Sequence, residues 1–168
     1  SSITENSGSN LTLTATLSGT TDADITVALD TSGTATEGTD YTDGSGNIND
    51  ITISAGSTTG SVNFTPTDDS VYEGNETATI SINGVSGKTG VAEHGTPQTV
   101  TITITDNETA GSVTLTVSAT SIAENGGSTL TLTATISSVS DEDVTVSLST
   151  SGTATEGTDY TDGSGSID

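Results

Sequence analysis

The amino-acid sequence predicts an all-β protein: an immunoglobulin-like antiparallel β-sandwich of about seven strands with Greek-key connections, in tandem repeats. Apolar and polar residues alternate with a period of two, as in "TVTITIT" at 99–105, which is typical of half-buried strands. No stretch of ten residues carries apolar side chains at i, i+3 and i+4, so no helix is expected. The third observation is an internal repeat at a fixed offset of 119 residues.

The repeat defines the organisation of the chain. The string "TSGTATEGTDYTDGSG" at 31–46 returns unchanged at 150–165, and 34 of 46 positions are identical between 3–48 and 122–167. A period this long indicates tandem domains, since solenoid repeats run to about 20–50 residues. We expect a nearly complete module over 1–108, without the start of its first strand, and the first half of a second, near-identical module over 109–168.

Each expected strand alternates apolar and polar residues between clusters of Gly, Ser, Asn and Asp. The first strand is visible only in the second copy, where "SVTLTVSA" places Val, Leu and Val at every second position of 112–119. The same alternation predicts the other six strands at 10–18, 24–30, 48–54, 60–66, 76–83 and 98–105. Aromatic residues make up only 2% of the chain, so the core must consist of small aliphatic side chains, with Tyr41, Phe64 and Tyr72 as its largest members.

The charge of the chain excludes several partners. The net charge is −22, with 23 acidic residues against Lys88 as the only Lys or Arg. Nucleic acid is therefore not expected as a partner, because the cations that neutralise phosphates are missing. Contact of this segment with an anionic membrane is not expected for the same reason.

The acidic residues are not spread evenly over the predicted sandwich. Successive strands run in alternating directions, so each loop can be assigned to one of two poles. One pole collects ten carboxylates of the first module: Glu5, Glu37, Asp40, Asp43, Asp68, Asp69, Glu73, Glu76, Asp106 and Glu108. Two like charges 4 Å apart repel by about 4 kcal/mol at an effective dielectric constant near 20. We therefore expect a counter-ion, although acidic loops that only keep the protein soluble are an alternative.

Ca²⁺ is the cation that suits this pole best, because it accepts six to eight oxygen ligands in flexible geometry. Mg²⁺ requires a tighter octahedron and is the second choice. Zinc and copper favour His or Cys, and the chain has one His and no Cys.

The loop strings resemble the Calx-beta domain, a seven-stranded module of sodium–calcium exchangers, integrin tails and large bacterial surface proteins. The resemblance rests on "TSGTATEGTDY" at 31–41, "DDSVYEGNE" at 68–76 and "DNE" at 106–108, in that order and spacing. It covers 1–108 and the available part of the second copy. Ser32 departs from the family pattern, where an Asp is usual, and so does Asn107, which suggests fewer or weaker ions.

The resemblance implies a set of calcium ligands. They come from an early Glu, the Asp of the "DY" dipeptide, the acids between the fifth and sixth strands, and the terminal acids. In this sequence the implied metal-binding positions are Glu5, Asp40, Asp68, Asp69, Glu73, Glu76, Asp106, Asn107 and Glu108, with Glu124 and Asp159 in the second copy.

These observations predict a calcium-binding extender of a large extracellular adhesin of the RTX type, at the bacterial cell surface. Its expected partners are neighbouring repeats of the same chain, and the sequence identifies no adhesion ligand. A regulatory calcium sensor, as in sodium–calcium exchangers, is an alternative, and so is a Thr-rich surface that binds ice or another ligand. We expect no enzyme, because paired carboxylates are not accompanied by a cleft-forming insertion or an aromatic sugar platform.

Overall fold

The structure is a computed structural model of the chain, and it describes residues 1–95 and 98–161. Its internal contacts divide the chain into two units, Ser1–Glu108 and Thr109–Asp168, here called unit 1 and unit 2. Within the described residues, no helix is long and apolar enough to span a membrane.

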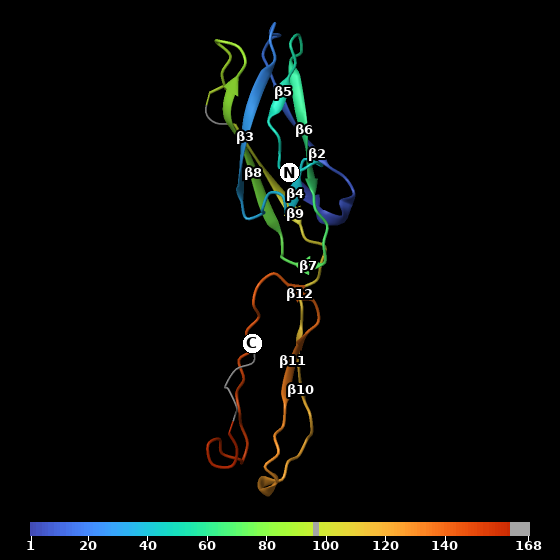
Figure 1. The fold of residues 1–168 in the computed structure, drawn as a ribbon, viewed down its shortest axis with the longest axis vertical. Helices are drawn as coiled ribbons and strands as arrows, with labels where there is room; N and C mark the ends of the chain where they lie inside the picture. The colour runs from blue at the N-terminus through green and yellow to red at the C-terminus, as the bar shows by residue number, and fades with distance from the viewer. Residues whose placement is uncertain (96–97, 162–168) are drawn as a thin grey trace. The chain divides into compact units, whose positions relative to one another are not determined.

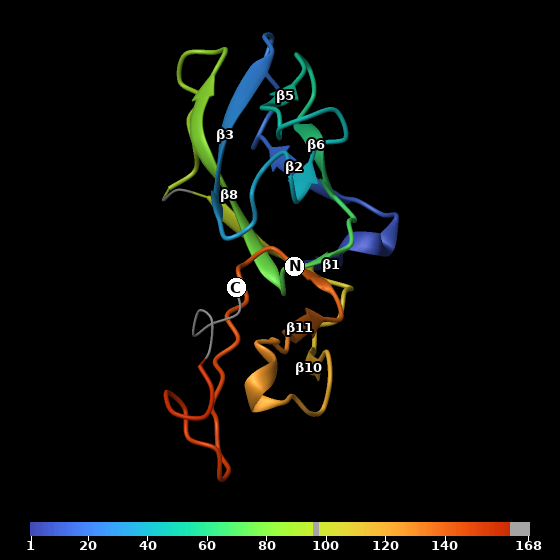
Figure 2. The ribbon, with the colours of Figure 1, turned by 60° about the horizontal axis from the view of Figure 1, so that its bottom comes forward.

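Unit 1 consists of two β-sheets packed face to face (Figure 1). The larger sheet has the order β1-β9-β8-β3-β5, with β1 at Ser2–Thr4, β9 at Thr99–Thr105, β8 at Glu76–Ser86, β3 at Ile25–Gly33 and β5 at Ile51–Ile53. The smaller sheet has the order β2-β6-β4, with β2 at Leu11–Thr16, β6 at Thr59–Pro66 and β4 at Tyr41–Thr42. Figure 2 shows β3 and β8 on one side of the unit and β2 and β6 on the other. This is the predicted β-sandwich.

Some strands differ from the bounds expected from the sequence. The strand expected at 48–54 is reduced to Ile51–Ile53. The backbone N–H of Ile48 donates instead to the Glu37 carboxylate at 2.6 Å. A short parallel strand, β1, pairs with β9 from Ser2 to Thr4 and was not expected from the alternation. It leads directly into η1, a 3₁₀ turn at Glu5–Ser7.

The core of unit 1 lies between the two sheets. Tyr41 and Phe64 are fully buried and stack with ring centroids 4.6 Å apart, which confirms two of the three expected large core residues. Tyr72, in β7 (Val71–Tyr72), is only half-buried. Aliphatic side chains from β3, β5, β8 and β9 fill the remainder: Ile25, Val27, Ile51, Ile53, Ala78, Ile80, Ile102 and Ile104.

One glycine lets the acidic 34–40 loop lie against β8. Gly33 has a φ of 129°, and a Cβ at this position would lie 2.0 Å from the backbone oxygen of Thr77. That oxygen accepts the N–H groups of Thr34 at 2.9 Å and Ala35 at 3.0 Å. Only glycine allows this approach, and it fixes where the loop that carries Asp40 begins.

The described part of unit 2, residues 109–161, contains fewer strands. β10 (Val113–Val117) and β11 (Leu132–Ile136) form an antiparallel pair, and η2 (Glu124–Gly126) lies in the segment that joins them. A further short strand, β12, covers Val139–Ser140. Apolar side chains of the pair remain exposed, among them Val113, Leu115, Val117, Leu132 and Ile136. Residues 162–165, the last part of the repeated string at 150–165, lie outside the described residues.

Candidate metal centre

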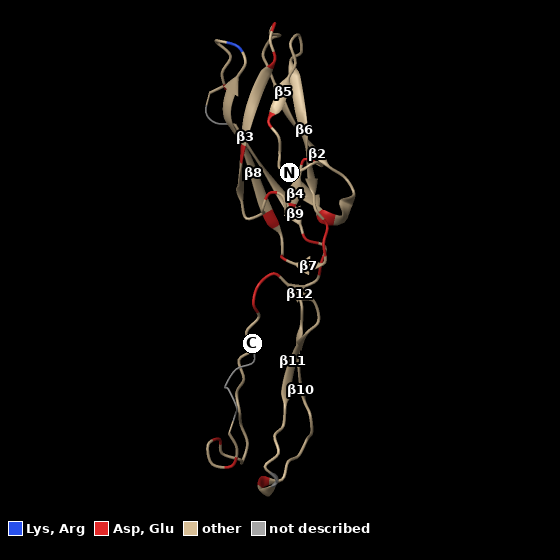
Figure 3. Cartoon of the chain, in the orientation of Figure 1, with Lys and Arg blue, Asp and Glu red and all other residues tan. Residues whose placement is uncertain are grey.

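Most of the predicted metal-binding acids of unit 1 lie at one end of its sandwich (Figure 3). β1 ends at the turn that begins with Glu5, β9 ends immediately before Asp106, and β8 begins at Glu76. The chain's only Lys or Arg, Lys88, lies at the opposite end, 2.5 Å from Asp22. No side-chain cation therefore neutralises the acidic end.

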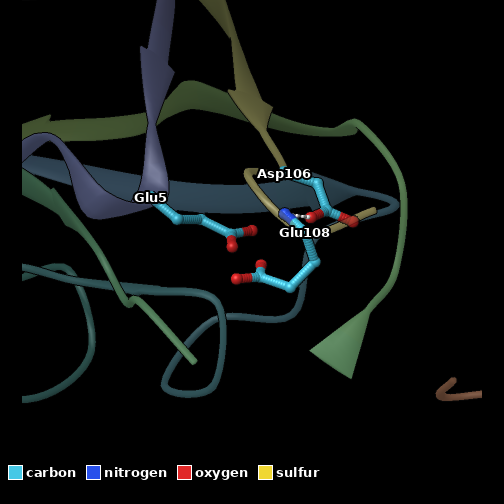
Figure 4. A group of neighbouring side chains, drawn as sticks. All are labelled: Glu5, Asp106 and Glu108. Carbon is cyan, nitrogen blue, oxygen red and sulfur yellow. Dashed lines mark hydrogen bonds between the residues drawn. The ribbon is translucent and has the colours of Figure 1, made fainter. Parts of the chain in front are cut away.

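The first group of carboxylates contains Glu5, Asp106 and Glu108. One oxygen atom of each lies within 4.8 Å of the others. Figure 4 shows the Glu5 side chain pointing toward that of Glu108, with Asp106 beside it. Glu5 is only 5% exposed, and neither its Oε2 atom nor that of Glu108 has a hydrogen-bond partner. Buried carboxylate oxygens are normally hydrogen-bonded, so these two are positioned for a ligand from outside the chain.

The second group contains Asp40, Glu73 and Glu76, which also offer oxygen atoms within 4.8 Å of one another. Asp40 is 8% exposed, and its Oδ2 atom accepts the N–H of Thr36 at 2.5 Å. The loop of Asp40 comes from between β3 and β4, whereas Glu73 precedes β8 and Glu76 starts it. Residues far apart in sequence therefore contribute to each group.

Asp106 connects the two groups. Its Oδ2 atom accepts the N–H groups of Glu73 at 2.8 Å and Gly74 at 2.5 Å, and its Oδ1 atom accepts the N–H of Glu108 at 2.6 Å. Its own N–H donates to Oδ1 of Asn75 at 3.2 Å. Gly74 has a φ of 77°, a left-handed conformation that favours glycine. Gly74 and Asn75 were not among the predicted site residues, although the "EGNE" string carries the turn signal.

The carboxylates perturb one another. Burial, followed by the charges of Asp106, Glu108, Asp69 and Glu73, raises the pKa of Glu5 to about 7. Burial and the neighbouring Asp106 also raise the pKa of Glu108. Burial acts to raise the pKa of Asp106 as well, but the three backbone N–H donors outweigh it and hold that pKa below its ordinary value. The hydrogen bonds therefore favour the ionised form of Asp106. The ionised form of Glu5 is unfavourable unless a cation binds beside it.

The remaining predicted residues lie outside these two groups. Asp68 and Asp69 are exposed, and Oδ1 of Asp69 accepts the N–H of Val71 at 2.7 Å. The Asn107 side-chain N–H donates to Oε1 of Glu108 at 2.7 Å, so its amide nitrogen faces the first group. In unit 2, Glu124 and Asp159 are both exposed, and Oδ2 of Asp159 accepts the N–H of Thr155 at 2.7 Å. Asp40 makes the equivalent bond in unit 1, where its Oδ2 atom accepts the N–H of Thr36.

Two other acids of the predicted pole have structural bonds. Glu37 accepts from Thr31 Oγ1 at 3.0 Å as well as from Ile48 N–H. Asp43 accepts from the backbone and side chain of Ser45, both at 2.7 Å, and from the Asn49 amide. The bonds of Glu37 and Asp43 occupy both oxygen atoms of each carboxylate and fix the 43–49 turn. Neither residue therefore belongs to the two groups.

The donor set fits a hard divalent cation. Both groups consist of carboxylate oxygens alone, and oxygen-only sites suit Ca²⁺ and Mg²⁺ rather than metals that favour nitrogen or sulfur. Fold and site together define a β-sandwich module with a candidate cation site, lined by carboxylates, at one end.

The comparisons place this module in a family. The Calx-beta domain matches residues 1–108 and again residues 106–168. The chain belongs to the Calx-beta domain family, which confirms the resemblance seen in the sequence. No curated protein sequence matches the chain significantly.

Two solved structures resemble the fold. The calcium binding domain CBD12 of CALX1.1 has 25% sequence identity and a TM-score of 0.51, and the match covers 69% of this chain and 46% of that chain. CBD12 from CALX1.2 has 24% identity and a TM-score of 0.49, with 62% and 40% covered. The match thus spans less than half the length of either structure.

Proposed function

We propose that unit 1 binds Ca²⁺ at the acidic end of its sandwich, and that the chain is a calcium-binding extender of a large extracellular adhesin at the bacterial cell surface. The observation that carries the proposal is the buried Glu5 carboxylate. It faces Asp106 and Glu108 within 4.8 Å, and its Oε2 atom has no hydrogen-bond partner. A divalent cation supplies the missing partner and the missing positive charge.

The residues of the two groups have distinct tasks in this proposal. Glu5, Asp106 and Glu108 hold one ion, and Asp40, Glu73 and Glu76 provide for a second. Asp106 also fastens the turn at Glu73 and Gly74 through its backbone hydrogen bonds. The similarity to a solved calcium binding domain supports Ca²⁺ over Mg²⁺ as the ion.

The extender role is supported by the place of the site in the chain. Asp106 and Glu108 are among the last residues of unit 1, and Thr109 begins unit 2. An ion held there fixes the final residues of one module to that module's own loops. Neighbouring repeats are then the main partners, and the module is a binding and spacing element rather than an enzyme.

Small-angle scattering of the 168-residue chain tests the extender role. We expect the maximum dimension of the chain to be larger in Ca²⁺ than in excess chelator, and its value to be better defined in the scattering data. Glu5→Gln should remove that response, whereas Asp22→Asn, which deletes one acid at the opposite end, should retain it. Identical scattering with and without Ca²⁺ would reject the stiffening role.

A regulatory calcium sensor is the second candidate, because the similar CBD12 structure is a calcium binding domain of CALX1.1. Affinity separates the two roles. Sensors bind Ca²⁺ at about 10⁻⁷–10⁻⁵ M, and extracellular modules at about 10⁻⁴–10⁻³ M. We expect the weaker range, since the near-identical repeats favour a structural array.

A further inference from the structure

The two carboxylate oxygen atoms of Glu108 have different surroundings. Oε1 accepts the side-chain N–H of Asn107 at 2.7 Å. Oε2 is buried and has no hydrogen-bond partner. Figure 4 shows this carboxylate close to that of Glu5, whose Oε2 atom also has no partner. The chain itself therefore satisfies one oxygen of Glu108 and leaves the other open.

The amide of Asn107 is an unusual donor at the acidic end. Among the described residues, it is the only side-chain N–H group that donates to the first group of carboxylates. The other donors are three backbone N–H groups, and all of them bond to Asp106. A donor beside a carboxylate offsets part of its negative charge and is stronger than a bond between neutral groups. In the metal-free chain the amide therefore does part of what a cation would do for Glu108.

The orientation of this amide does not suit a metal ligand. The nitrogen end contacts Glu108, and an amide nitrogen donates hydrogen bonds but offers no lone pair to a metal. Only Oδ1 of Asn107 is a possible ligand atom. To present Oδ1 in place of the nitrogen, the amide must rotate and give up its bond to Glu108.

The bond also limits what Glu108 offers to an ion. Carboxylates bind Ca²⁺ with one oxygen atom or with two, and the number of charged ligands tunes the affinity. Because Oε1 accepts from Asn107, only Oε2 is open. The amide hydrogens, which carry partial positive charge, also repel a cation held by the same carboxylate. The Asn107 bond therefore opposes tight calcium binding.

We propose that Asn107 sets the affinity of the cation site as a hydrogen-bond donor and is not a metal ligand. Its amide stabilises Glu108 while the site is empty, and it leaves Glu108 a single oxygen atom for an ion. The chain thus gains stability in the metal-free state and loses calcium affinity. The inference rests on the proposed calcium site and assigns a regulating role to one residue within it.

Asn107→Ala separates the donor role from the ligand role. The residue is exposed, so the substitution leaves no cavity, and it removes the amide without adding a charge. We expect Ca²⁺ affinity, measured by calorimetric titration, to rise by about threefold or more, the effect of one hydrogen bond of ordinary net strength. The urea midpoint in chelator should fall. A Ca²⁺ affinity that is unchanged or lower would overturn the proposal, because loss of a ligand weakens binding.

Asn107→Asp replaces the donor by a further carboxylate. Calcium affinity should rise by at least about tenfold, since the charge of the ligand set increases, and the urea midpoint in chelator should fall further than in Asn107→Ala. Asn83→Asp is the charge-matched control, because Asn83 is exposed and lies toward the other end of β8 from Glu76. Equal effects of the two Asp variants would mean that net charge alone acts, and would contradict the role of Asn107.

A second variant tests whether Asn107 acts through Glu108. In a chain that carries Glu108→Ala, the acceptor is absent, so Asn107→Ala should no longer lower the urea midpoint in chelator. A decrease of the same size as in the unmodified chain would overturn the proposed contact. These stability measurements need no Ca²⁺. Absence of Ca²⁺ uptake by the unmodified chain would refute the proposed function and the effect on affinity, whereas an unchanged midpoint in Asn107→Ala would refute the stabilising role of the amide alone.

Discussion

The carboxylate of Asp106 accepts the backbone N–H of Glu73 at 2.8 Å. This bond joins the residue that follows β9 to the turn that precedes β8, and so brings the two carboxylate groups together. Asp106 thus has a structural role that is present without any ion. The Oε2 atom of Glu5 has no hydrogen-bond partner and gains one only from a ligand. Substitutions at the two positions should therefore behave differently.

Asp106→Asn should destabilise unit 1 both with and without Ca²⁺. An amide provides one oxygen where the carboxylate accepts three N–H groups, and its NH₂ group faces donors. The loss is about 1–3 kcal/mol for buried groups left without a partner. Urea unfolding in chelator and in Ca²⁺ measures it. Unchanged stability in chelator would contradict the structural role of Asp106.

Glu5→Gln should have opposite effects in the two conditions. Without Ca²⁺ it removes a buried negative charge that faces Asp106 and Glu108, so stability should be equal to or higher than that of the unmodified chain. With Ca²⁺ it removes a ligand, and affinity should fall by at least about tenfold, or ~1.4 kcal/mol. Calorimetric titration measures the Ca²⁺ affinity and thermal unfolding in chelator measures the stability. Asp22→Asn is the charge-matched control for both. A loss of stability in chelator would show that the Glu5 charge already has a partner in the chain.

The raised pKa of Glu5 predicts a pH dependence with a definite sign. In the metal-free folded state the pKa is about 7, against an ordinary value of 4.5, so the folded state holds a proton that the unfolded state has lost. The Glu5 contribution to stability is therefore present below about pH 4.5 and falls as pH rises to about 7. Calcium affinity should rise over the upper part of this range, because the proton competes with the ion.

Thermal unfolding in chelator at a series of pH values measures this effect. Glu5→Gln should flatten the dependence between about pH 5 and pH 7. A stability that rises with pH over this interval in the unmodified chain, and is unaffected by the substitution, would exclude the assigned pKa.

Two glycine substitutions should differ in severity. Gly33→Ala places a Cβ 2.0 Å from the Thr77 oxygen, so the loop of Asp40 must move or the unit must unfold. Gly74→Ala meets only the Tyr72 hydroxyl, 4.0 Å away, and its cost is the left-handed conformation, about 1–2 kcal/mol. Urea unfolding in chelator should rank Gly33→Ala as clearly the less stable variant. The reverse order would mean that the loop does not lie against β8 as described.

The alternation of apolar residues predicted the sheet strands because side-chain burial in a sandwich follows a period of two. It did not predict β1, because three residues are too few to show a period and their pairing with β9 is parallel. It also overestimated the strand at 48–54. There, a long-range bond from Ile48 to the Glu37 carboxylate replaces strand pairing, and no local pattern reveals such a bond.

For the site, loop positions predicted which acids share one end of the unit, since strand direction decides the end at which each loop lies. They did not separate Glu5 and Asp40, which are buried, from Asp68 and Asp69, which are exposed. Nor did they show that the Asp43 carboxylate is occupied by Ser45 and Asn49. Burial and hydrogen bonding within loops depend on side-chain positions that only the three-dimensional structure provides.

Thermal unfolding of the unmodified chain in excess chelator and in saturating Ca²⁺ tests the central claim most directly. An ion that binds only the folded state should stabilise unit 1 by about 2.7 kcal/mol at a free concentration of 100 times Kd. We predict an upward shift of Tm that grows with Ca²⁺ concentration and is lost in Glu5→Gln. A Tm that is identical in chelator and in Ca²⁺, for a chain whose folding is otherwise intact, would contradict the account.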